Sequence, residues 1–346
     1  MSIEHISYNA LATALGGDYA KISKATAPFE SFAGAWDKVS KNYPKLNAQS
    51  AWDAMLREGV TLILKDDDEF PTNLREIPYP PFGIYIKGSV DALTKKSIAI
   101  VGTRRATPLG KTIARKFANE LIKEDFVISS GLALGVDSAA HSGALEAGGI
   151  NIAVLACGLD AVYPASNRDL AQDILENNGA IISEYPLESP AYAFRFLERN
   201  RIVSGLAMGT LVVEAPERSG SLATARFALE QNRNVYVIPG PINSQNYKGS
   251  NSLIKAGAML VTETTDILKD LNIEPKQLSL EINREMPELS AEEVGIFSVI
   301  QKAGSPLTVD KIIELSNYEP YTVNKNLTFL ILKDIIKESG GHYYVN

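Results

Sequence analysis

The sequence predicts an α/β protein built on an open, mostly parallel sheet, with a small helical module before the sheet and a winged-helix domain after it. Between residues 58 and 271, short apolar runs typical of strands buried on both faces alternate with helical stretches rich in alanine and leucine. The segment before this region has helical spacing, and the segment after it has the order helix, helix, helix, hairpin. The central part is Rossmann-like, and ligands of that architecture lie at the carboxyl ends of the strands.

Residues 1–57 form the predicted N-terminal helical module. Apolar residues recur at helical spacing, as at Leu11 and Leu15, and the dipeptide Gly16-Gly17 marks a turn between helices. We find no residue pattern with a chemical role in this segment and interpret it as structural.

The central region, residues 58–271, begins with two short apolar runs separated by the acidic stretch 66–69, which we interpret as a solvated loop. The predicted strands are Val60–Leu64, Phe82–Lys87, Ile98–Val101, Phe126–Ser130, Ile152–Ala156, Ala180–Ser183, Thr210–Glu214, Val235–Ile238 and Met259–Thr262. The predicted helices span 109–124, 136–147, 167–177, 192–206, 222–231 and 250–256. This regular alternation predicts helices on both faces of the sheet.

Residues 272–288 are polar, contain two prolines and are interpreted as a linker. Residues 289–346 then form the predicted winged-helix domain, with helices Glu292–Ala303, Thr308–Ser316 and Tyr321–Lys333 and a strand at His342–Val345. A winged helix suggests DNA binding, but residues 286–346 carry a net charge of −3, which opposes phosphate contact. A protein-interaction or structural role and direct reading of DNA both stay open for this domain.

Composition limits the partners of the 346-residue chain, which is 45% apolar and 22% charged, as ordinary globular proteins are. The formal net charge is −7 and no segment is basic as a whole, so a site for a polyanion must be a local cluster made by folding. One cysteine and three scattered histidines offer no metal-ligand spacing, and we expect neither a metal nor a cofactor. No signal-peptide pattern and no membrane-length apolar run is present, which predicts a cytoplasmic location.

Residues 97–116 carry the clearest chemical signal. A buried strand leads through Gly102 to Arg104 and Arg105, and the helix that follows is capped by Thr107. A helix N-terminus at the carboxyl end of a parallel strand presents unpaired N–H groups and a partial positive charge. The stretch therefore predicts a phosphate site.

Two common nucleotide motifs do not fit this stretch. A Walker A loop ends in Gly-Lys-Thr, as Gly110-Lys111-Thr112 does, but Arg105 stands where its first glycine belongs. A dinucleotide fingerprint that starts at Gly102 meets Arg104 and Thr107 in place of its second and third glycines, and the second strand does not end in an acid. We therefore favour a phosphate held by arginines and backbone amides over ATP or NAD.

Other segments bring matching groups to the same predicted edge of the sheet. Arg199-Asn200-Arg201 lies on a helix, and because these two arginines cannot share one helix face, at least one must lie near a bend or point inward. Ser219-Gly220 opens a second helix N-terminus, and Lys248 opens a third helix that carries Lys255. Together these turns predict a groove.

The acid–base candidates at this edge are Glu184 and Glu214, each at the end of a strand. His141 lies on an alanine-rich helix and is expected to be a packed core residue, and Cys157 is expected to be a small buried apolar one. Because no nucleophile–base pair is evident, we expect binding rather than catalysis.

These motifs resemble the DNA-processing protein A family (DprA, also called Smf). The matching stretches lie between residues 60 and 270 and are VGTRRATPLG, SGLALGVDSAAHSGAL, GLDAVYPASN, RNRIVSGL, TLVVEAPERSGSLATA, NVYVIPGPI and KGSNSLIKAGA. The resemblance implies a protein of natural transformation that binds single-stranded DNA without strong sequence preference, protects the incoming strand and loads the recombinase RecA. It also implies a homodimer through the Rossmann-like domain, which would join two modest pockets on one strand.

The resemblance also assigns binding residues. It carries over to the turn after the first parallel strand, to the two arginines and the asparagine of RNR, and to the two lysines of KGSNSLIK. The aromatic residue before RNR, Phe196, is a candidate for base stacking and equally for the core. The predicted DNA-binding set is Gly102, Thr103, Arg104, Arg105, Phe196, Arg199, Asn200, Arg201, Ser219, Gly220, Lys248 and Lys255.

Two alternatives belong to other functional classes. Related Rossmann-like enzymes hydrolyse the N-glycosidic bond of nucleoside monophosphates, and SGSLATA resembles their phosphate loop, with Glu214 or Glu230 as the catalytic acid. The PGG-x-GT form of that loop is missing from this sequence. The other alternative is a transcription factor that binds duplex DNA through the winged helix.

Overall fold

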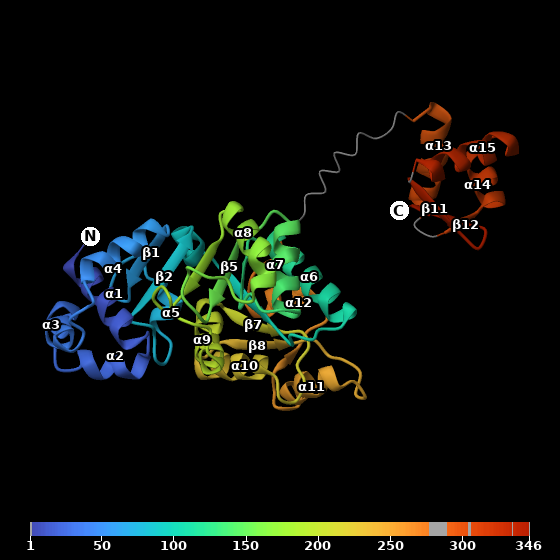
Figure 1. Cartoon of the computed structure of the whole chain (residues 1–346). Coiled ribbons are helices and arrows are strands. Elements are labelled where there is room, and N and C mark those ends of the chain that lie inside the picture. The colour runs from blue at the N-terminus through green and yellow to red at the C-terminus, as the bar shows by residue number, and fades with distance from the viewer. Residues whose placement is uncertain (1, 277–288, 304–305, 334, 346) are drawn as a thin grey trace. The chain divides into compact units, whose positions relative to one another are not determined.

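The computed structural model describes residues 2–276, 289–303, 306–333 and 335–345 (Figure 1). The chain divides into two compact units, Met1–Lys276 and Gln277–Asn346. Most of the predicted linker, residues 277–288, lies outside the described residues.

The first unit begins with four helices in the segment predicted to be helical. They are α1 (Ile3–Leu15), α2 (Tyr19–Thr26), α3 (Phe32–Val39) and α4 (Ala48–Arg57). Gly16 ends α1 in the left-handed conformation (φ 67°), which glycine adopts without strain. Asp18 caps α2 by accepting a hydrogen bond from the N–H of Lys21. We call residues 2–57 the N-terminal module.

A nine-stranded sheet with the order β1-β2-β6-β5-β4-β3-β7-β8-β9 follows the N-terminal module. The strands are β1 (Val60–Leu64), β2 (Gly83–Gly88), β3 (Ser97–Val101), β4 (Val127–Ser130), β5 (Asn151–Leu155), β6 (Ala180–Ser183), β7 (Gly209–Val212), β8 (Asn234–Val237) and β9 (Met259–Leu260). The seven strands from β3 to β9 are parallel, whereas β2 pairs antiparallel with both β1 and β6. The predicted α/β class with a mostly parallel sheet is confirmed.

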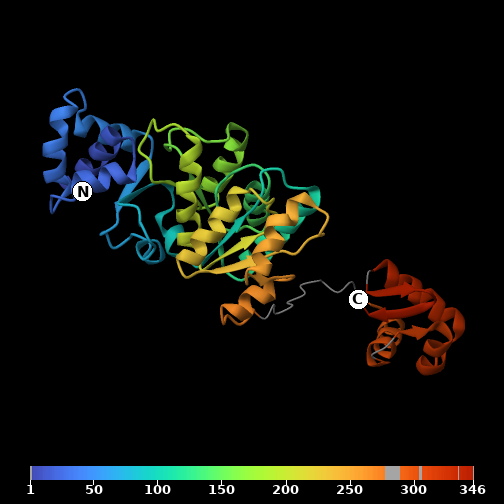
Figure 2. The same cartoon turned by 90° about the horizontal axis from the view of Figure 1, so that it is seen from below.

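Helices cover both faces of this sheet (Figure 2). They are α5 (Thr72–Arg75), α6 (Pro108–Lys123), α7 (Val136–Glu146), α8 (Arg168–Glu176), α9 (Ala193–Leu206), α10 (Gly220–Glu230), α11 (Lys248–Lys255) and α12 (Thr264–Asp270), with 3₁₀ turns at Ser40–Asn42, Val90–Thr94, Ala165–Asn167 and Gln245–Tyr247. On β3, Ala99 and Val101 pack in the core beneath α9 and α10, while Ile98 and Ile100 pack beneath α6 and α7. A strand buried on both faces is expected to be mainly apolar, and β3 is buried throughout and apolar after Ser97.

The order of the strands reverses beside β3. The chain runs from β3 outward through β4 and β5 to β6, and then returns to place β7 on the other side of β3. Connections on opposite sides of the sheet separate at this point and leave a crevice at the carboxyl ends of β3 and β7.

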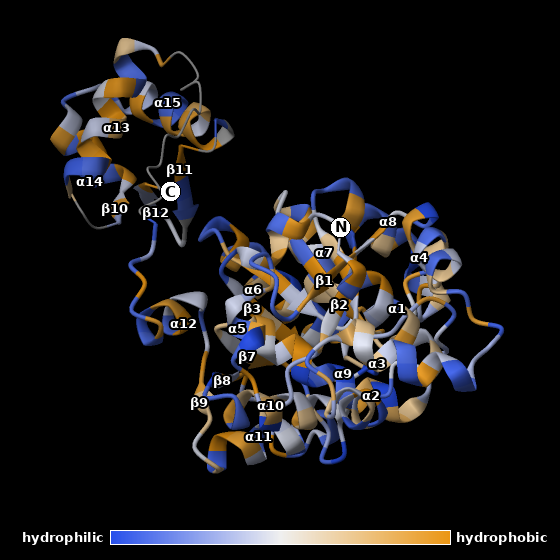
Figure 3. Cartoon of the chain, turned by 90° about the vertical axis from the view of Figure 1, so that its left-hand side faces the viewer, coloured by the Kyte–Doolittle hydropathy of each residue, from blue (hydrophilic) through white to orange (hydrophobic). Residues whose placement is uncertain are grey.

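The second unit contains α13 (Ala291–Ala303), α14 (Val309–Ser316) and α15 (Pro320–Leu332) and a three-stranded antiparallel sheet in the order β10 (Leu307–Thr308), β12 (His342–Val345) and β11 (Ile336–Ser339). Apolar and polar residues alternate along its helices, as in the first unit (Figure 3). Its winged-helix assignment stays a prediction.

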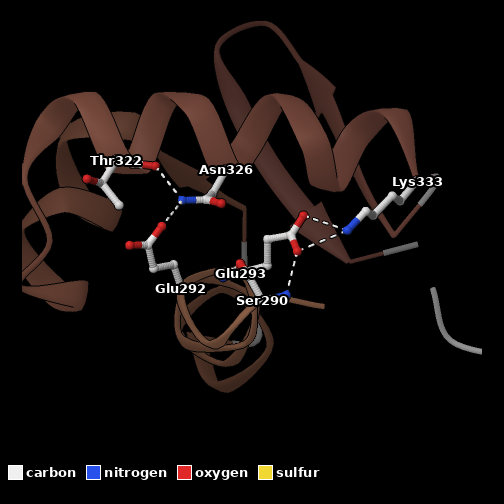
Figure 4. Close-up of polar contacts among 6 residues, drawn as sticks. All are labelled: Ser290, Glu292, Glu293, Thr322, Asn326 and Lys333. Carbon is white, nitrogen blue, oxygen red and sulfur yellow. Dashed lines mark hydrogen bonds and ion pairs between the residues drawn. The ribbon is translucent and has the colours of Figure 1, made fainter. Parts of the chain in front are cut away.

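Two polar contacts join α13 to the end of α15 and to its middle (Figure 4). The Glu293 carboxylate accepts hydrogen bonds from the Lys333 ammonium at 2.8 and 2.9 Å, and the buried Asn326 amide donates to Glu292 at 3.2 Å.

Among the described residues, no helix is long and apolar enough to cross a membrane, and no group of His, Cys, Asp or Glu side chains has an arrangement that would hold a metal ion.

Candidate functional site

A cavity of about 580 Å³ lies at the carboxyl ends of β3, β4 and β7, beside α9. We call it the strand-end cavity. Of the predicted DNA-binding residues it is lined by Gly102, Thr103, Arg104, Arg105, Phe196, Arg199, Asn200, Ser219 and Gly220. The topological switch point thus brings together predicted residues from three separate segments of the chain, 102–105, 196–200 and 219–220.

The turn after β3 is held in place by Glu214, which follows β7. The buried Glu214 carboxylate accepts hydrogen bonds from the Thr107 N–H at 2.9 Å, from the Thr107 hydroxyl at 2.5 Å and from the Asn246 amide at 3.1 Å. A Cβ at Gly110 would overlap this carboxylate, so the glycine makes room for Glu214. Glu214 is therefore a structural clamp and does not line the strand-end cavity.

Gly135 shapes the same turn from the side of α7. Its φ of 87° is in the region that only glycine adopts readily, and a Cβ there would overlap the Thr103 carbonyl. The backbone of Gly135 can therefore lie directly against Thr103 and Arg104.

Three exposed guanidiniums line the cavity, those of Arg104, Arg105 and Arg218. The Arg104 guanidinium lies 4.9 Å from the centre of the Phe196 ring. Within the described part of the chain, none of the three forms an ion pair with a carboxylate. Their charge is therefore available to an anionic ligand. The predicted set did not include Arg218, although it directly precedes the predicted Ser219-Gly220.

The floor of the cavity holds a buried cation, Arg199, which is 4% exposed. Its Nη1 donates to the carbonyls of Gly131, at 2.8 Å, and of Val154. Burial lowers the pKa of Arg199 to about 10 and raises the pKa of the nearby Asp137, whose carboxylate accepts a hydrogen bond from the Gly131 N–H. Backbone carbonyls thus hold the Arg199 guanidinium in place, and the Asp137 carboxylate, which also lines the cavity, is a nearby opposite charge.

Aromatic side chains form another part of the lining. The Tyr163 ring, which is 46% exposed and follows β5, lies 5.3 Å from the partly buried Phe196 ring with an interplanar angle of 57°. Sequence reasoning missed Tyr163, although it lies in the stretch GLDAVYPASN that carries the family resemblance. The lining therefore combines cations with one exposed and one partly buried aromatic ring.

The N-terminus of α10 completes the lining. Ser219 caps this helix by accepting a hydrogen bond from the Ser221 N–H, and the Asn200 amide donates to the Gly220 carbonyl at 3.2 Å. The second contact ties α9 to the start of α10. The helix start adds a partial positive charge to the guanidiniums.

Three predicted binding residues do not line the cavity: Arg201, Lys248 and Lys255. The Arg201 side chain points away from that of Arg199 on the same helix. Arg201 is 7% exposed, and its Nη2 donates a hydrogen bond to the Glu184 carboxylate at 2.5 Å. The two lysines are exposed at the ends of α11. The structure therefore does not place these three in the strand-end cavity with the others, and a DNA-binding role for the two exposed lysines stays a prediction.

The predicted acid–base candidates have structural contacts instead. Glu184 is buried against Arg201, and burial raises the pKa of Glu184. Glu230, the other acid of the hydrolase alternative, is exposed at the far end of α10 from the cavity. His141 is buried and hydrogen-bonded to Asn151 at 2.8 Å, as a core histidine.

Comparisons with known proteins agree with the fold. A family model for DNA recombination-mediator protein A matches residues 61–272. Protein Smf of Escherichia coli K12 is 37% identical over 294 residues, which cover 79% of this chain and 78% of that protein. The solved structure of DNA processing protein A from Streptococcus pneumoniae has a TM-score of 0.65 and 33% identity and covers 78% of this chain and 99% of that one. The structure of DNA processing protein A from Helicobacter pylori, described for its single-stranded DNA binding mode, has a TM-score of 0.56 and 32% identity and covers 62% of this chain and 95% of that one.

Proposed function

The chain belongs to the DNA recombination-mediator protein A family, and on this premise we propose that it binds single-stranded DNA in the strand-end cavity. The observation that carries the proposal is the combination of exposed guanidiniums with the exposed Tyr163 ring and the partly buried Phe196 ring in one lining. The Helicobacter pylori relative is described as binding single-stranded DNA, which supports the same ligand here.

The lining suits both parts of an unpaired nucleotide. Arg104, Arg105 and Arg218 offer charged donors to phosphate oxygens, and Phe196 and Tyr163 offer surfaces on which bases stack. Stacking of one base on an aromatic side chain is worth about 1–3 kcal/mol and does not depend strongly on sequence. In a duplex the base faces are already covered by their neighbours, so this contribution is lost. We infer a preference for single strands over duplex and little preference among sequences.

A local cavity reconciles DNA binding with a net charge of −7. A cavity of this size would contact few phosphates, so counterion release would contribute modestly to each site. A homodimer through the first unit would engage one strand with two cavities and raise the overall affinity without a basic surface.

We extend the proposal to the cell on the basis of family membership. The protein would act in the cytoplasm during natural transformation, protect the incoming strand and load the recombinase RecA onto it. It would do so without catalysing a reaction and without a cofactor. The carboxylates on which the nucleotide-hydrolase alternative depends, Glu214 and Glu230, do not line the cavity, which supports a binding role.

The experiment is fluorescence anisotropy with the full chain and labelled oligonucleotides, single-stranded and duplex, at several salt concentrations. We expect salt-sensitive binding of single strands and much weaker binding of the duplex. Equal affinity for both forms would contradict the proposal. Incubation with AMP checks the enzymatic alternative, for which release of free adenine is the supporting result.

A further inference from the structure

Helix α9 has two functional sides. One side lines the strand-end cavity with Phe196, Arg199 and Asn200. The other carries Arg195 and Arg201, whose guanidiniums contact the N-terminal module. Helix α2 of this module lies beside α9 (Figure 3). No residue of the N-terminal module lines the strand-end cavity. The module therefore touches the helix that carries the cavity residues, but not the cavity itself.

Arg195 joins the first turn of α9 to the end of α1. Its Nη2 donates to the Gly16 carbonyl at 2.5 Å and its Nη1 to the Pro190 carbonyl at 3.0 Å. Its guanidinium lies 4.3 Å from the centre of the Tyr185 ring, and the residue is 6% exposed. These contacts fix one guanidinium between the N-terminal module and the segment that leads into α9.

Arg201 joins the same helix to β6 and α2 two turns further on. Its ion pair with Glu184 is buried, and its guanidinium lies 5.6 Å from the centre of the Tyr19 ring of α2. Removing one partner from a buried ion pair leaves an uncompensated charge, which the surrounding structure must move to solvate. The position of α9 therefore depends on this pair remaining intact.

Displacement of α9 would disturb its contacts with two other parts of the cavity, the strand ends and the start of α10. Arg199 is held by two backbone carbonyls from the sheet side, and Asn200 is hydrogen-bonded to Gly220 at the start of α10. A shift of α9 would break these contacts and spread the cations away from the aromatic rings.

We propose that the N-terminal module positions α9 for DNA binding, with Arg195 and Arg201 as positioning residues that do not touch the DNA. The inference rests on the proposed function for its DNA-binding part. It gives the module a role in setting the affinity of the cavity. Because such coupling is reciprocal, bound DNA in turn strengthens the contact between module and helix.

Salt dependence separates this role from a direct phosphate contact. Loss of one phosphate contact to a single strand reduces the slope of log K against log salt by about 0.7, whereas loss of positioning weakens binding with an unchanged slope. The informative variants are Glu184→Gln, which leaves Arg201 in place, and Tyr19→Ala on the module, with Lys38→Ala on the exposed side of α3 as the control.

We expect Glu184→Gln and Tyr19→Ala to weaken single-strand binding roughly two- to thirtyfold, with the wild-type salt slope and the wild-type circular dichroism spectrum. Lys38→Ala should bind as the wild type does. Unchanged affinity in both informative variants would overturn the proposal, and so would tighter binding by Glu184→Gln, which is expected if Arg201 contacts phosphate when released.

Amide hydrogen exchange on the DNA-free protein keeps this test separate from the proposed function. If the module holds α9, exchange in α9 and at the start of α10 is faster in Tyr19→Ala than in Lys38→Ala. Equal exchange in the two variants overturns the positioning role whether or not DNA binds. A third outcome is that exchange is faster in Tyr19→Ala but the wild-type protein binds no single strand. This outcome would support positioning of α9 and refute the DNA-binding function.

Discussion

The centres of the Tyr163 and Phe196 rings lie 5.3 Å apart, although Tyr163 belongs to the loop after β5 and Phe196 to helix α9. Replacing Phe196 by alanine removes a stacking surface, so single-strand affinity should fall by about 1–3 kcal/mol in anisotropy titrations. Phe194→Ala is the matched control, because Phe194 is exposed on the same helix but does not line the cavity. Equal losses in the two variants would show that Phe196 does not stack on a base.

Glu214 and Thr107 are expected to determine the stability of the turn after β3. In Glu214→Gln, one acceptor oxygen becomes an amide nitrogen that cannot accept from Thr107, which leaves a partly buried donor without that acceptor. We expect the free energy of unfolding to fall by about 1–3 kcal/mol in urea denaturation, and single-strand affinity to fall with it. Glu217→Gln, an exposed carboxylate in the next turn, should leave both unchanged. A stable Glu214 variant would show that the clamp is dispensable.

Stability should depend on pH through His141. Burial lowers the pKa of His141 to about 4, below its ordinary value of about 6.5, so the folded state binds the proton more weakly than the unfolded state. His141 therefore costs no stability above about pH 6.5, and stability is lost as the pH falls from there toward about 4, by an amount on the order of 3 kcal/mol.

The pH comparison must be made against His141→Gln. Burial raises the pKa values of Asp137 and Glu184, which changes stability with the opposite sign over part of the same range. Asp137 and Glu184 are present in both proteins, so their contributions cancel when one unfolding free energy is subtracted from the other. The difference in unfolding free energy should therefore shrink or invert as the pH falls below 6.5. A constant difference between pH 7 and pH 4.5 would contradict the assignment.

The second unit should contribute little to single-strand binding. Its segment is acidic, and Lys333, one of its few cations, is paired with Glu293. A chain that ends before residue 286 should keep most of the affinity of the full chain in the same anisotropy assay. A large loss would show that the charge argument against DNA binding by this unit is wrong.

The sheet could be predicted from the sequence because strands buried on both faces are near-continuous apolar runs, as β3 is after Ser97 and β5 is after Asn151. Because the turn from Gly102 to Arg105 directly follows β3, it could also be placed at the edge of the sheet where that strand ends. The antiparallel pairing of β2 with β6 could not, because it depends on which strands meet in space and not on their periodicity.

Individual side chains of the site were harder to place. Arg199 and Arg201 are two positions apart on a helix, and only the contacts with Gly131 and Glu184 decide which of them faces the cavity. Glu214 ends a strand at the right edge, as an acid–base residue would, but a glycine at position 110 leaves room for its carboxylate to clamp Thr107 instead. Such roles follow from tertiary contacts that no local pattern records.

The central claim is that single-stranded DNA binds in the strand-end cavity. The most direct test compares the substitution of one arginine inside the cavity with the substitution of one lysine outside it. Arg104→Ala removes an exposed guanidinium from the cavity, whereas Lys255→Ala removes an exposed cation outside it. We predict that anisotropy titrations with a labelled single strand show weaker binding and a shallower salt dependence for Arg104→Ala, and wild-type binding for Lys255→Ala. Wild-type affinity in Arg104→Ala, or an equal loss in both variants, would contradict the claim.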